Sequence, residues 1–167
     1  MIHEVSGDIL LTRASAIAHG VAPNDPFHSG LALSLREQWP SMYKDFRHYC
    51  QSTHPKPGTL WEWSGTGPHG PIHIINLLTQ EGAYGHGEKP GRAHLEFVNH
   101  ALKALHALAV QEKFASLALP RLATGVGGLD WKTVHPLVVQ HLGSLKIPVW
   151  VYTTFHKGQQ ADERGGA

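Results

Sequence analysis

The stretch that most constrains this chain covers residues 117–131 and has the sequence LALPRLATGVGGLDW. An apolar run ending at Pro120 has the length of a buried strand, three glycines follow in a short loop, and Asp130 has the residue type of a helix N-cap. A strand that passes through a glycine loop into a helix directs free backbone N–H groups and the positive end of a helix dipole at one place. The stretch therefore predicts an anion site, and a phosphate or diphosphate is the ligand that fits it.

The apolar pattern of the whole chain predicts alternating strands and helices. Strands are expected over residues 1–5, 16–21, 59–63, 72–78, 117–120 and 147–152, and helices over residues 31–39, 42–50, 93–114 and 131–142. The helix over residues 93–114 carries one apolar stripe at three- and four-residue spacing. The turn over residues 65–71 is expected to join two strands as a hairpin. Pro40 is expected to end the helix over residues 31–39. Together these elements predict a three-layer α/β/α fold with a mixed central sheet.

The length of 167 residues and the hydrophobic content of 41% suit one domain with a proper core. That domain is expected over residues 1–156, and the polar segment 157–167 is expected to be a flexible C-terminal tail. The 14 basic and 13 acidic residues give a formal net charge of +1. This balance leaves no broad electrostatic footprint for nucleic acid or membrane, so a polyanion would be met locally, at a site.

The cysteine and histidine content argues against disulfides and metal sites. A single Cys50 excludes an internal disulfide framework and a thiolate-rich zinc site. The 14 histidines are scattered without ligand spacing, so we expect no metal and no cofactor. No apolar run has membrane length and no signal-peptide pattern opens the chain, so we expect a cytoplasmic monomer with no membrane partner.

Four segments, taken in order, resemble the macrodomain family. They are GDIL at residues 7–10, HSGLA at residues 28–32, LPRLATGVGGLDW at residues 119–131 and VYTT at residues 151–154. The resemblance covers about the first 155 residues. Within the family the chain looks most like the branch that contains the terminal ADP-ribose glycohydrolase and the antitoxin macrodomains that remove ADP-ribose from DNA.

The resemblance implies an ADP-ribose site. Asp8 would accept a hydrogen bond from the adenine amine, the main chain of Ile9 would fix the base, and Tyr152 or Phe155 would pack on its face. The first loop would lie against the distal ribose, and the second would wrap the diphosphate. The residues implied to bind ADP-ribose are Asp8, Ile9, His19, His28, Ser29, Gly30, Leu31, Ala123, Thr124, Gly125, Val126, Gly127, Gly128, Tyr152 and Phe155.

Four polar residues keep a structural alternative. Asp8 follows a turn glycine and equally suits an Asx-type turn or cap. Asn24 could orient a hydroxyl or water at the distal ribose, or serve only as a turn residue between two prolines. Asp130 favours the helix N-cap over a catalytic base, and His19 favours a buried, hydrogen-bonded histidine over a proton donor or acceptor.

The chain departs from its relatives where their catalytic groups are expected. The resemblance places a catalytic lysine of the antitoxin macrodomains at Ser29, and a lysine and an aspartate of the terminal glycohydrolase at Gln80 and Gly127. None of these three residues supplies an amine or a carboxylate. Any acid–base chemistry would then come from His19, His28 or His86, because imidazole exchanges protons near neutral pH.

Three functions follow from this pattern. The first is hydrolysis of an ADP-ribosyl linkage on a protein or nucleic acid, by water attack at the distal ribose without a lysine adduct. The second is a reader that binds ADP-ribose and turns nothing over, which the missing lysine and aspartate favour. The third is a phosphatase of ADP-ribose 1″-phosphate, which His19 and the glycine-rich loop around His86 suggest.

Overall fold

The computed structural model describes residues 1–85, 87 and 89–164, and a six-stranded sheet runs through its centre. The strands are β1 (Ile2–Gly7), β2 (Ala16–Val21), β3 (Leu60–Gly67), β4 (Gly70–Leu78), β5 (Leu117–Pro120) and β6 (Val149–Phe155), in the order β1-β6-β5-β2-β4-β3. All neighbours are parallel except β3 and β4, which form an antiparallel hairpin. The mixed sheet expected from the sequence is confirmed.

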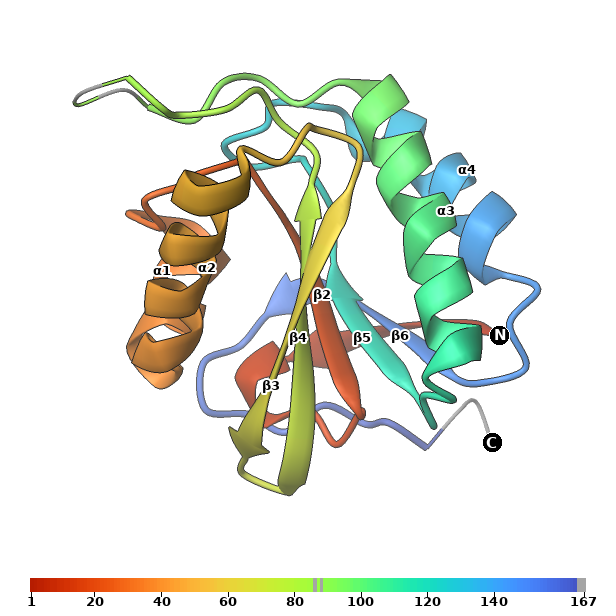
Figure 1. The fold of residues 1–167 in the computed structure, drawn as a ribbon. Helices are drawn as coiled ribbons and strands as arrows, with labels where there is room; N and C mark the ends of the chain where they lie inside the picture. The colour runs from red at the N-terminus through yellow and green to blue at the C-terminus, as the bar shows by residue number, and fades with distance from the viewer. Residues whose placement is uncertain (86, 88, 165–167) are drawn as a thin grey trace.

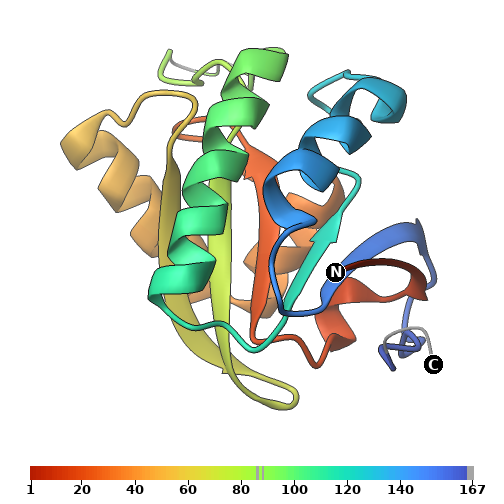
Figure 2. The same cartoon turned by 90° about the vertical axis from the view of Figure 1, so that its right-hand side faces the viewer.

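Two pairs of helices cover the two faces of the sheet (Figures 1 and 2). Helices α1 (Gly30–Gln38) and α2 (Pro40–Thr53) lie on one face, and α3 (Leu95–Gln111) and α4 (Trp131–Leu142) lie on the other. A short 3-10 helix, η1 (Ile9–Leu11), follows β1. Pro40 begins α2 instead of lying between two helices, because proline lacks only an N–H that the first turn leaves unpaired anyway.

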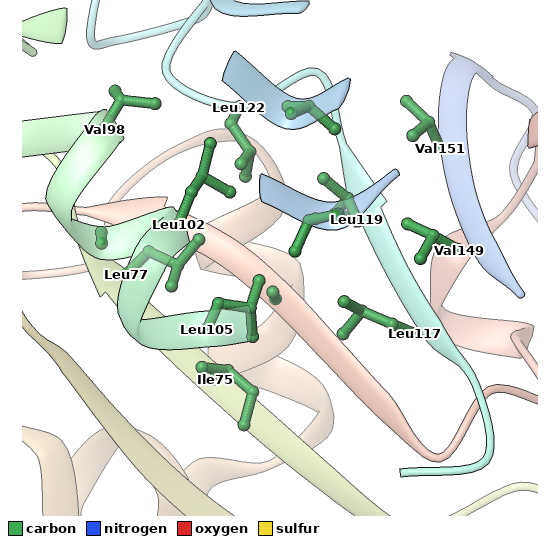
Figure 3. Close-up of a cluster of buried hydrophobic side chains, with 14 of the residues drawn as sticks. Ile75, Leu77, Val98, Leu102, Leu105, Leu117, Leu119, Leu122, Val149 and Val151 are labelled. Atoms are coloured by element: carbon green, nitrogen blue, oxygen red, sulfur yellow. The ribbon is translucent and has the colours of Figure 1, made fainter. Parts of the chain in front are cut away.

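Alternation along the strands divides the core into two halves. In β2, Ala16 and Ala18 face α3 and α4, whereas Ile17 faces α1 and α2. The α3 side of the core is drawn in Figure 3, where the apolar stripe of α3 meets the strands. Its labelled members are Ile75, Leu77, Val98, Leu102, Leu105, Leu117, Leu119, Leu122, Val149 and Val151. Each large side chain buried this way stabilises the fold by about 1.5–3 kcal/mol.

The segment after β6 runs back along η1 and packs there. The Glu163 carboxylate accepts hydrogen bonds from the Thr12 hydroxyl (2.5 Å), the Arg13 N–H (2.8 Å) and the Tyr152 hydroxyl (2.6 Å). Ala161 is buried among the apolar residues on the α1 side. These contacts tie the described residues of the segment to the domain. The boundary at residue 156 and the flexible tail over residues 157–167 stay predictions, and residues 165–167 lie outside the described residues.

The described helices are too short or too polar to cross a membrane.

Candidate active site

The carboxyl ends of β2 and β5 lie next to each other, because these strands are parallel neighbours in the sheet. After β2 the chain passes to α1 and α2 on one face, and after β5 it passes to α4 on the other (Figure 1). Where neighbouring strands send the chain to opposite faces, a crevice opens beyond the strand ends, and ligands of such sheets bind there. The two loops predicted from the sequence are the loops that leave these strand ends.

A cleft at this edge consists of three adjoining lobes. The central lobe, of about 330 Å³, lies between residues 29–32, where the first loop passes into α1, and residues 120–127, where β5 passes into the second loop. The apolar lobe, of about 390 Å³, shares Leu31, Tyr152 and Phe155 with the central lobe and adds Ile9 and Leu10. These shared residues show that the two lobes adjoin.

The third lobe, here called the arm lobe, has a volume of about 490 Å³. It shares Ser29 and Val126 with the central lobe and none of its described lining residues with the apolar lobe, so it adjoins the cleft at the central lobe. The remaining residues of its lining are Pro26, His28, Gly87, Lys89 and Pro90.

Charge on the cleft lining is one-sided. Among the described residues that line the three lobes there is no aspartate or glutamate, whereas Lys89 and Arg121 line the arm and central lobes. Cations beside a described lining that holds no carboxylate favour an anionic ligand, because no described side chain of the lining repels it. No set of three histidine, cysteine or carboxylate side chains that could hold a metal ion occurs within residues 1–85, 87 and 89–164.

Main-chain hydrogen bonds shape the second loop, residues 121–130. The N–H of Leu129 donates to the carbonyl oxygen of Ala123 (3.0 Å), and the N–H of Ala93 donates to that of Gly127 (3.0 Å). Asp130 caps α4, since its carboxylate accepts a hydrogen bond from the N–H of Lys132 (2.9 Å), as its sequence position predicted. In the described part of the chain the N–H groups of residues 124–126 have no acceptor on the protein, so they are available to an anion.

Buried side chains shape the first loop, residues 22–29. The Asp25 carboxylate accepts hydrogen bonds from the N–H groups of Ala22 (2.9 Å) and Phe27 (2.8 Å), and burial raises the pKa of this carboxyl. Asn24 accepts a hydrogen bond from the Arg47 guanidinium (2.9 Å) and donates one to the carbonyl oxygen of Ala83 (3.3 Å). Asn24 lines none of the three lobes, and its contacts are those of the turn residue that the sequence left as an alternative.

His19 lies at the carboxyl end of β2 and lines the central lobe. Its Nε2 lies 2.7 Å from the side-chain oxygen of Asn76 on β4, and its ring meets that of Phe27 edge-on with centroids 5.6 Å apart. Burial lowers the pKa of His19 to about 4, so the ring is neutral at pH 7. Because the Asn76 oxygen accepts, Nε2 carries the hydrogen and Nδ1 keeps its lone pair.

Asp8 and Tyr152 are held by the segment after β6. The carboxylate of Asp8 caps η1 by accepting from the N–H of Leu10 (3.0 Å) and also accepts from the N–H of Gly158 (2.9 Å). Asp8 therefore makes the cap that its sequence allowed, and it lines none of the three lobes. Burial and the hydrogen bond to Glu163 raise the pKa of Tyr152 well above its usual range.

The three positions at which relatives are expected to carry catalytic groups are now placed. Ser29 and Gln80 both line the central lobe, and the side-chain amide of Gln80 donates to the carbonyl oxygen of Gly91 (2.9 Å). A Cβ added at Gly127 would lie 2.7 Å from the carbonyl oxygen of Ala123 and 2.8 Å from the Cβ of Ala93. This loop therefore has no room for a carboxylate side chain at residue 127.

Most residues predicted to bind ADP-ribose come together in this cleft. Those that line the central lobe are His19, Ser29, Gly30, Leu31, Ala123, Thr124, Gly125, Val126, Gly127, Tyr152 and Phe155. Ile9 lines the apolar lobe and His28 the arm lobe, whereas Gly128 lines none of the three. His86 lies outside the described residues. Sequence reasoning missed Arg121, which directly follows a strand end, and Lys89, which lies in a loop rich in glycine.

Residues 18–138 match the family model of the Macro domain. The chain belongs to the Macro domain family. This membership confirms the resemblance seen in the sequence, and the structure has the α/β/α layers expected of it.

Similar proteins agree with this assignment. The macrodomain is 28% identical over 153 residues to a DNA ADP-ribosyl glycohydrolase of Thermus aquaticus, covering 91% of this chain and 41% of the relative. It is 29% identical over 139 residues to a protein of the same name from Mycobacterium tuberculosis, covering 83% of this chain and 38% of the relative. The chain thus spans less than half the length of these relatives.

Solved structures extend the likeness to the whole fold. The macrodomain of Mycobacterium tuberculosis DarG superimposes with a TM-score of 0.81 at 27% identity, covering 91% of this chain and 97% of that one. The macrodomain of Thermus aquaticus DarG gives 0.78 at 27% identity, covering 92% and 98%. Thermosipho africanus DarTG in complex with ADP-ribose gives 0.78 at 21% identity, covering 95% and 42%, and shows a shared fold.

Proposed function

We propose that this macrodomain binds ADP-ribose in the three-lobed cleft and hydrolyses an ADP-ribosyl linkage on a macromolecule. The observation that carries the proposal is the central lobe, which is lined by residues 124–126 with their unpaired N–H groups and by no described carboxylate, beside an apolar lobe large enough for a base. A dinucleotide-like ligand needs this combination of an anion cradle and an apolar pocket. The printed names of the relatives, DNA ADP-ribosyl glycohydrolase, support the reaction class.

The lobes suggest how ADP-ribose would lie. The adenine would occupy the apolar lobe between Ile9 and the rings of Tyr152 and Phe155, and the diphosphate would lie along residues 123–127. The distal ribose would then lie against Ser29 and Gly30. Acceptance of the adenine amine by Asp8 stays a prediction, since each Asp8 oxygen already accepts one main-chain hydrogen bond and keeps a second lone pair.

The reaction in this proposal is a hydrolysis at the anomeric carbon of the distal ribose. The oxygen of water bonds to that carbon, the bond from the carbon to the macromolecule breaks, and the leaving atom takes up a proton. A mechanism with two carboxylates is not available to the described lining, which holds none. His28 in the arm lobe is our candidate for moving the proton, and neutral His19 is suited to orient water or a hydroxyl through Nδ1.

A substitution at Gly125 tests whether the cleft is the ADP-ribose site. A Cβ at Gly125 meets no atom within 4 Å, so the side chain of Gly125→Leu would extend into open space beside the free N–H groups. We expect isothermal titration with ADP-ribose to show affinity reduced by about tenfold or more, with the free energy of unfolding within about 0.5 kcal/mol of wild type. The control Lys103→Leu adds the same side chain to an exposed position on α3. Absence of ADP-ribose binding by the wild type would rule out the proposal.

A reader without turnover is the second candidate, and Ser29, Gln80 and Gly127 favour it because none of them supplies a base or nucleophile. Release of ADP-ribose from modified protein or DNA by the wild type, and its loss in His28→Ala, would exclude the reader. Release of phosphate from ADP-ribose 1″-phosphate would instead identify a phosphatase.

We further propose that the protein is cytoplasmic and monomeric. The single Cys50 is buried and free, which suits a reducing compartment. Sedimentation of the purified chain tests the oligomeric state, and fractionation of the producing cells tests the location.

A further inference from the structure

His19, Asn76 and Trp61 occupy one row across three neighbouring strands of the sheet. In the strand register His19 of β2 is the partner of Asn76 of β4, and Asn76 is the partner of Trp61 of β3. His19 lines the central lobe, whereas Asn76 is fully buried and lines none of the three lobes. The row therefore joins a residue of the cleft to a buried amide that no ligand in the cleft would touch.

The hydrogen bonds of Asn76 determine which way its side-chain amide points. The amide nitrogen donates to the carbonyl oxygen of Trp61 (3.4 Å) and lies 3.8 Å from the sulfur of Met42. A carbonyl oxygen can only accept, so the amide nitrogen faces Trp61 and the amide oxygen faces His19. That oxygen lies 2.7 Å from Nε2 of His19, and because it too can only accept, Nε2 carries the ring hydrogen.

The other ring nitrogen of His19, Nδ1, is left for a ligand. Among the described residues no hydrogen bond reaches Nδ1, and this atom is not one of the buried polar atoms that lack a partner, so it is accessible. The space that His19 borders is the central lobe. A neutral imidazole with its hydrogen on Nε2 has a lone pair on Nδ1, so Nδ1 accepts a hydrogen bond and donates none.

The central lobe thus offers a ligand two opposite kinds of polar group. The unpaired N–H groups of residues 124–126 donate, which suits the oxygens of a phosphate. Nδ1 of His19 accepts, which suits a hydroxyl and disfavours an ionised phosphate, because a phosphate without a hydrogen has nothing to donate. In ADP-ribose the hydroxyl groups of the distal ribose directly follow the diphosphate, so the order of donors and acceptor matches this ligand.

We propose that Asn76 is a positioning residue that keeps Nδ1 of His19 an acceptor for a hydroxyl of the distal ribose. The inference rests on the proposed function and adds a determinant of ligand specificity to it. Asn76 acts through the ring hydrogen of His19, because the hydrogen bond made at one imidazole nitrogen selects the tautomer and so the character of the other. The contact should distinguish ADP-ribose from ADP, which has the same base and diphosphate but no distal ribose.

The tautomer of His19 is measured by nitrogen NMR of the imidazole ring in the wild type at pH 7. Burial lowers the pKa of His19 to about 4, so the ring is neutral at this pH. We expect the hydrogen on Nε2, and we expect Asn76→Leu to lose this preference because leucine offers no acceptor. A hydrogen on Nδ1 of the wild type would overturn the inference without any variant.

Titration with ADP-ribose and with ADP tests whether the tautomer matters to the ligand. We expect Asn76→Leu to weaken ADP-ribose about three- to tenfold and to leave ADP within about twofold of wild type, because only ADP-ribose has a hydroxyl for Nδ1. The matched control is Asn99→Leu on α3. The oxygen of Asn99 also accepts from a histidine, 2.6 Å from Nε2 of His141, and Asn99 lines none of the three lobes. This control should leave both ligands within about twofold of wild type.

The variant Asn76→Asp changes the charge of the ring while an oxygen acceptor stays opposite Nε2. A carboxylate beside an imidazole raises the pKa of the ring, and a charged ring carries hydrogen on both nitrogens and cannot accept. We therefore expect weaker ADP-ribose binding at each pH where NMR shows the ring of this variant to be charged, and binding like wild type where the ring is neutral. The other titratable side chains of the described lining are common to both proteins, so comparison at each pH removes their effect; they are His28, Lys89, Arg121 and Tyr152.

Three binding results would overturn the inference and leave the proposed function intact. Asn76→Leu could weaken ADP as much as ADP-ribose, or it could bind both ligands as Asn99→Leu does. Asn76→Asp with a charged ring could also bind ADP-ribose as tightly as with a neutral one. Failure of the wild type to bind ADP-ribose would instead remove the proposed function, and NMR would still report the tautomer of His19.

Discussion

The two loops that face each other across the central lobe are built in opposite ways. The first loop, residues 22–29, is organised by side chains that it buries, with Asp25 accepting two of its own main-chain N–H groups and Phe27 packed under His19. The second loop, residues 121–130, is organised by main-chain hydrogen bonds and by a position, Gly127, at which no side chain fits. Removal of side chains should disrupt the first loop, and addition of one should disrupt the second.

This difference bears on what each loop offers a ligand. The second loop leaves main-chain N–H groups free because few side chains crowd it, which suits an anion. The polar side chains of the first loop make hydrogen bonds within the protein. Asn24 is an example, since both the oxygen and the nitrogen of its side-chain amide are paired with protein groups. The first loop therefore offers a ligand mainly its shape, whereas the second offers unpaired main-chain N–H groups that can bind an anion.

The largest effect is expected at Gly127 of the second loop. Gly127→Asp would restore the residue type implied for a relative, yet its Cβ would overlap the carbonyl oxygen of Ala123 and the Cβ of Ala93. We expect the free energy of unfolding to fall by about 3 kcal/mol, measured by chemical denaturation. Gly125→Ala is the matched control and should change it by less than about 0.5 kcal/mol, because a Cβ there meets nothing within 4 Å. An undiminished stability of Gly127→Asp would show that the second loop adapts.

The pH dependence of stability should report on the first loop through His19. Its pKa is about 4 in the folded protein, whereas the usual value in an unfolded chain is about 6.5. The unfolded chain therefore binds more protons between these values, so this contribution is present above about pH 6.5 and is lost as the pH falls toward 4. Its size is at most about 3 kcal/mol.

The variant His19→Gln isolates this contribution. Burial raises the pKa of Asp25, which makes the free energy of unfolding change with pH in the opposite direction to the effect of His19. Burial lowers the pKa of His141, which makes it change in the same direction as His19 does. The free energies of unfolding of wild type and His19→Gln are measured at a series of pH values from 4 to 7. The contributions of Asp25 and His141 are common to the two proteins, so they cancel in the difference between the two free energies. Parallel curves would contradict the prediction, and a gap that closes toward low pH would support it.

A smaller effect is expected for the Asp25 carboxylate. Asp25→Ala leaves the N–H groups of Ala22 and Phe27 without their acceptor in a buried loop, so we expect a loss of about 2 kcal/mol in the free energy of unfolding. Asp162→Ala is the control, since this exposed aspartate pairs at the surface with Arg164 and its removal should leave the free energy of unfolding close to that of wild type. Equal losses for the two variants would mean that the first loop does not depend on its buried carboxylate.

Periodicity in the sequence predicted the elements that carry the site. The leucine stripe of α3 predicts a helix with one buried face, because only that geometry buries the whole stripe. The continuous apolar run of β4 predicts a central strand that is buried on both faces of the sheet. The glycine stretch predicted the second loop and its Asp130 cap, since both depend on residues close in the chain. Local signals of this kind can be read without knowing the fold.

Features that depend on distant residues could not be predicted. The pairing of Asp8 with Gly158 and of Thr12 with Glu163 joins opposite ends of the chain, and the polar composition of residues 157–167 pointed instead to a free tail. Lys89 lines the arm lobe in a segment that the N–H of Ala83 ties to the carbonyl oxygen of Pro23. No periodicity in the sequence indicates this hydrogen bond between distant residues. The crowding at Gly127 comes from Ala93, a residue more than thirty positions earlier in the sequence.

The contact between Glu163 and Tyr152 has a consequence for the apolar lobe. The family pattern covers residues 18–138, which include both loops of the central lobe. Ile9, Tyr152 and Phe155, which line the apolar lobe, lie outside that pattern, as does the carboxylate that orients the Tyr152 hydroxyl. One wall of the apolar lobe therefore depends on a carboxylate eleven positions further along the chain, so loss of that carboxylate would free the Tyr152 ring without touching either loop of the central lobe.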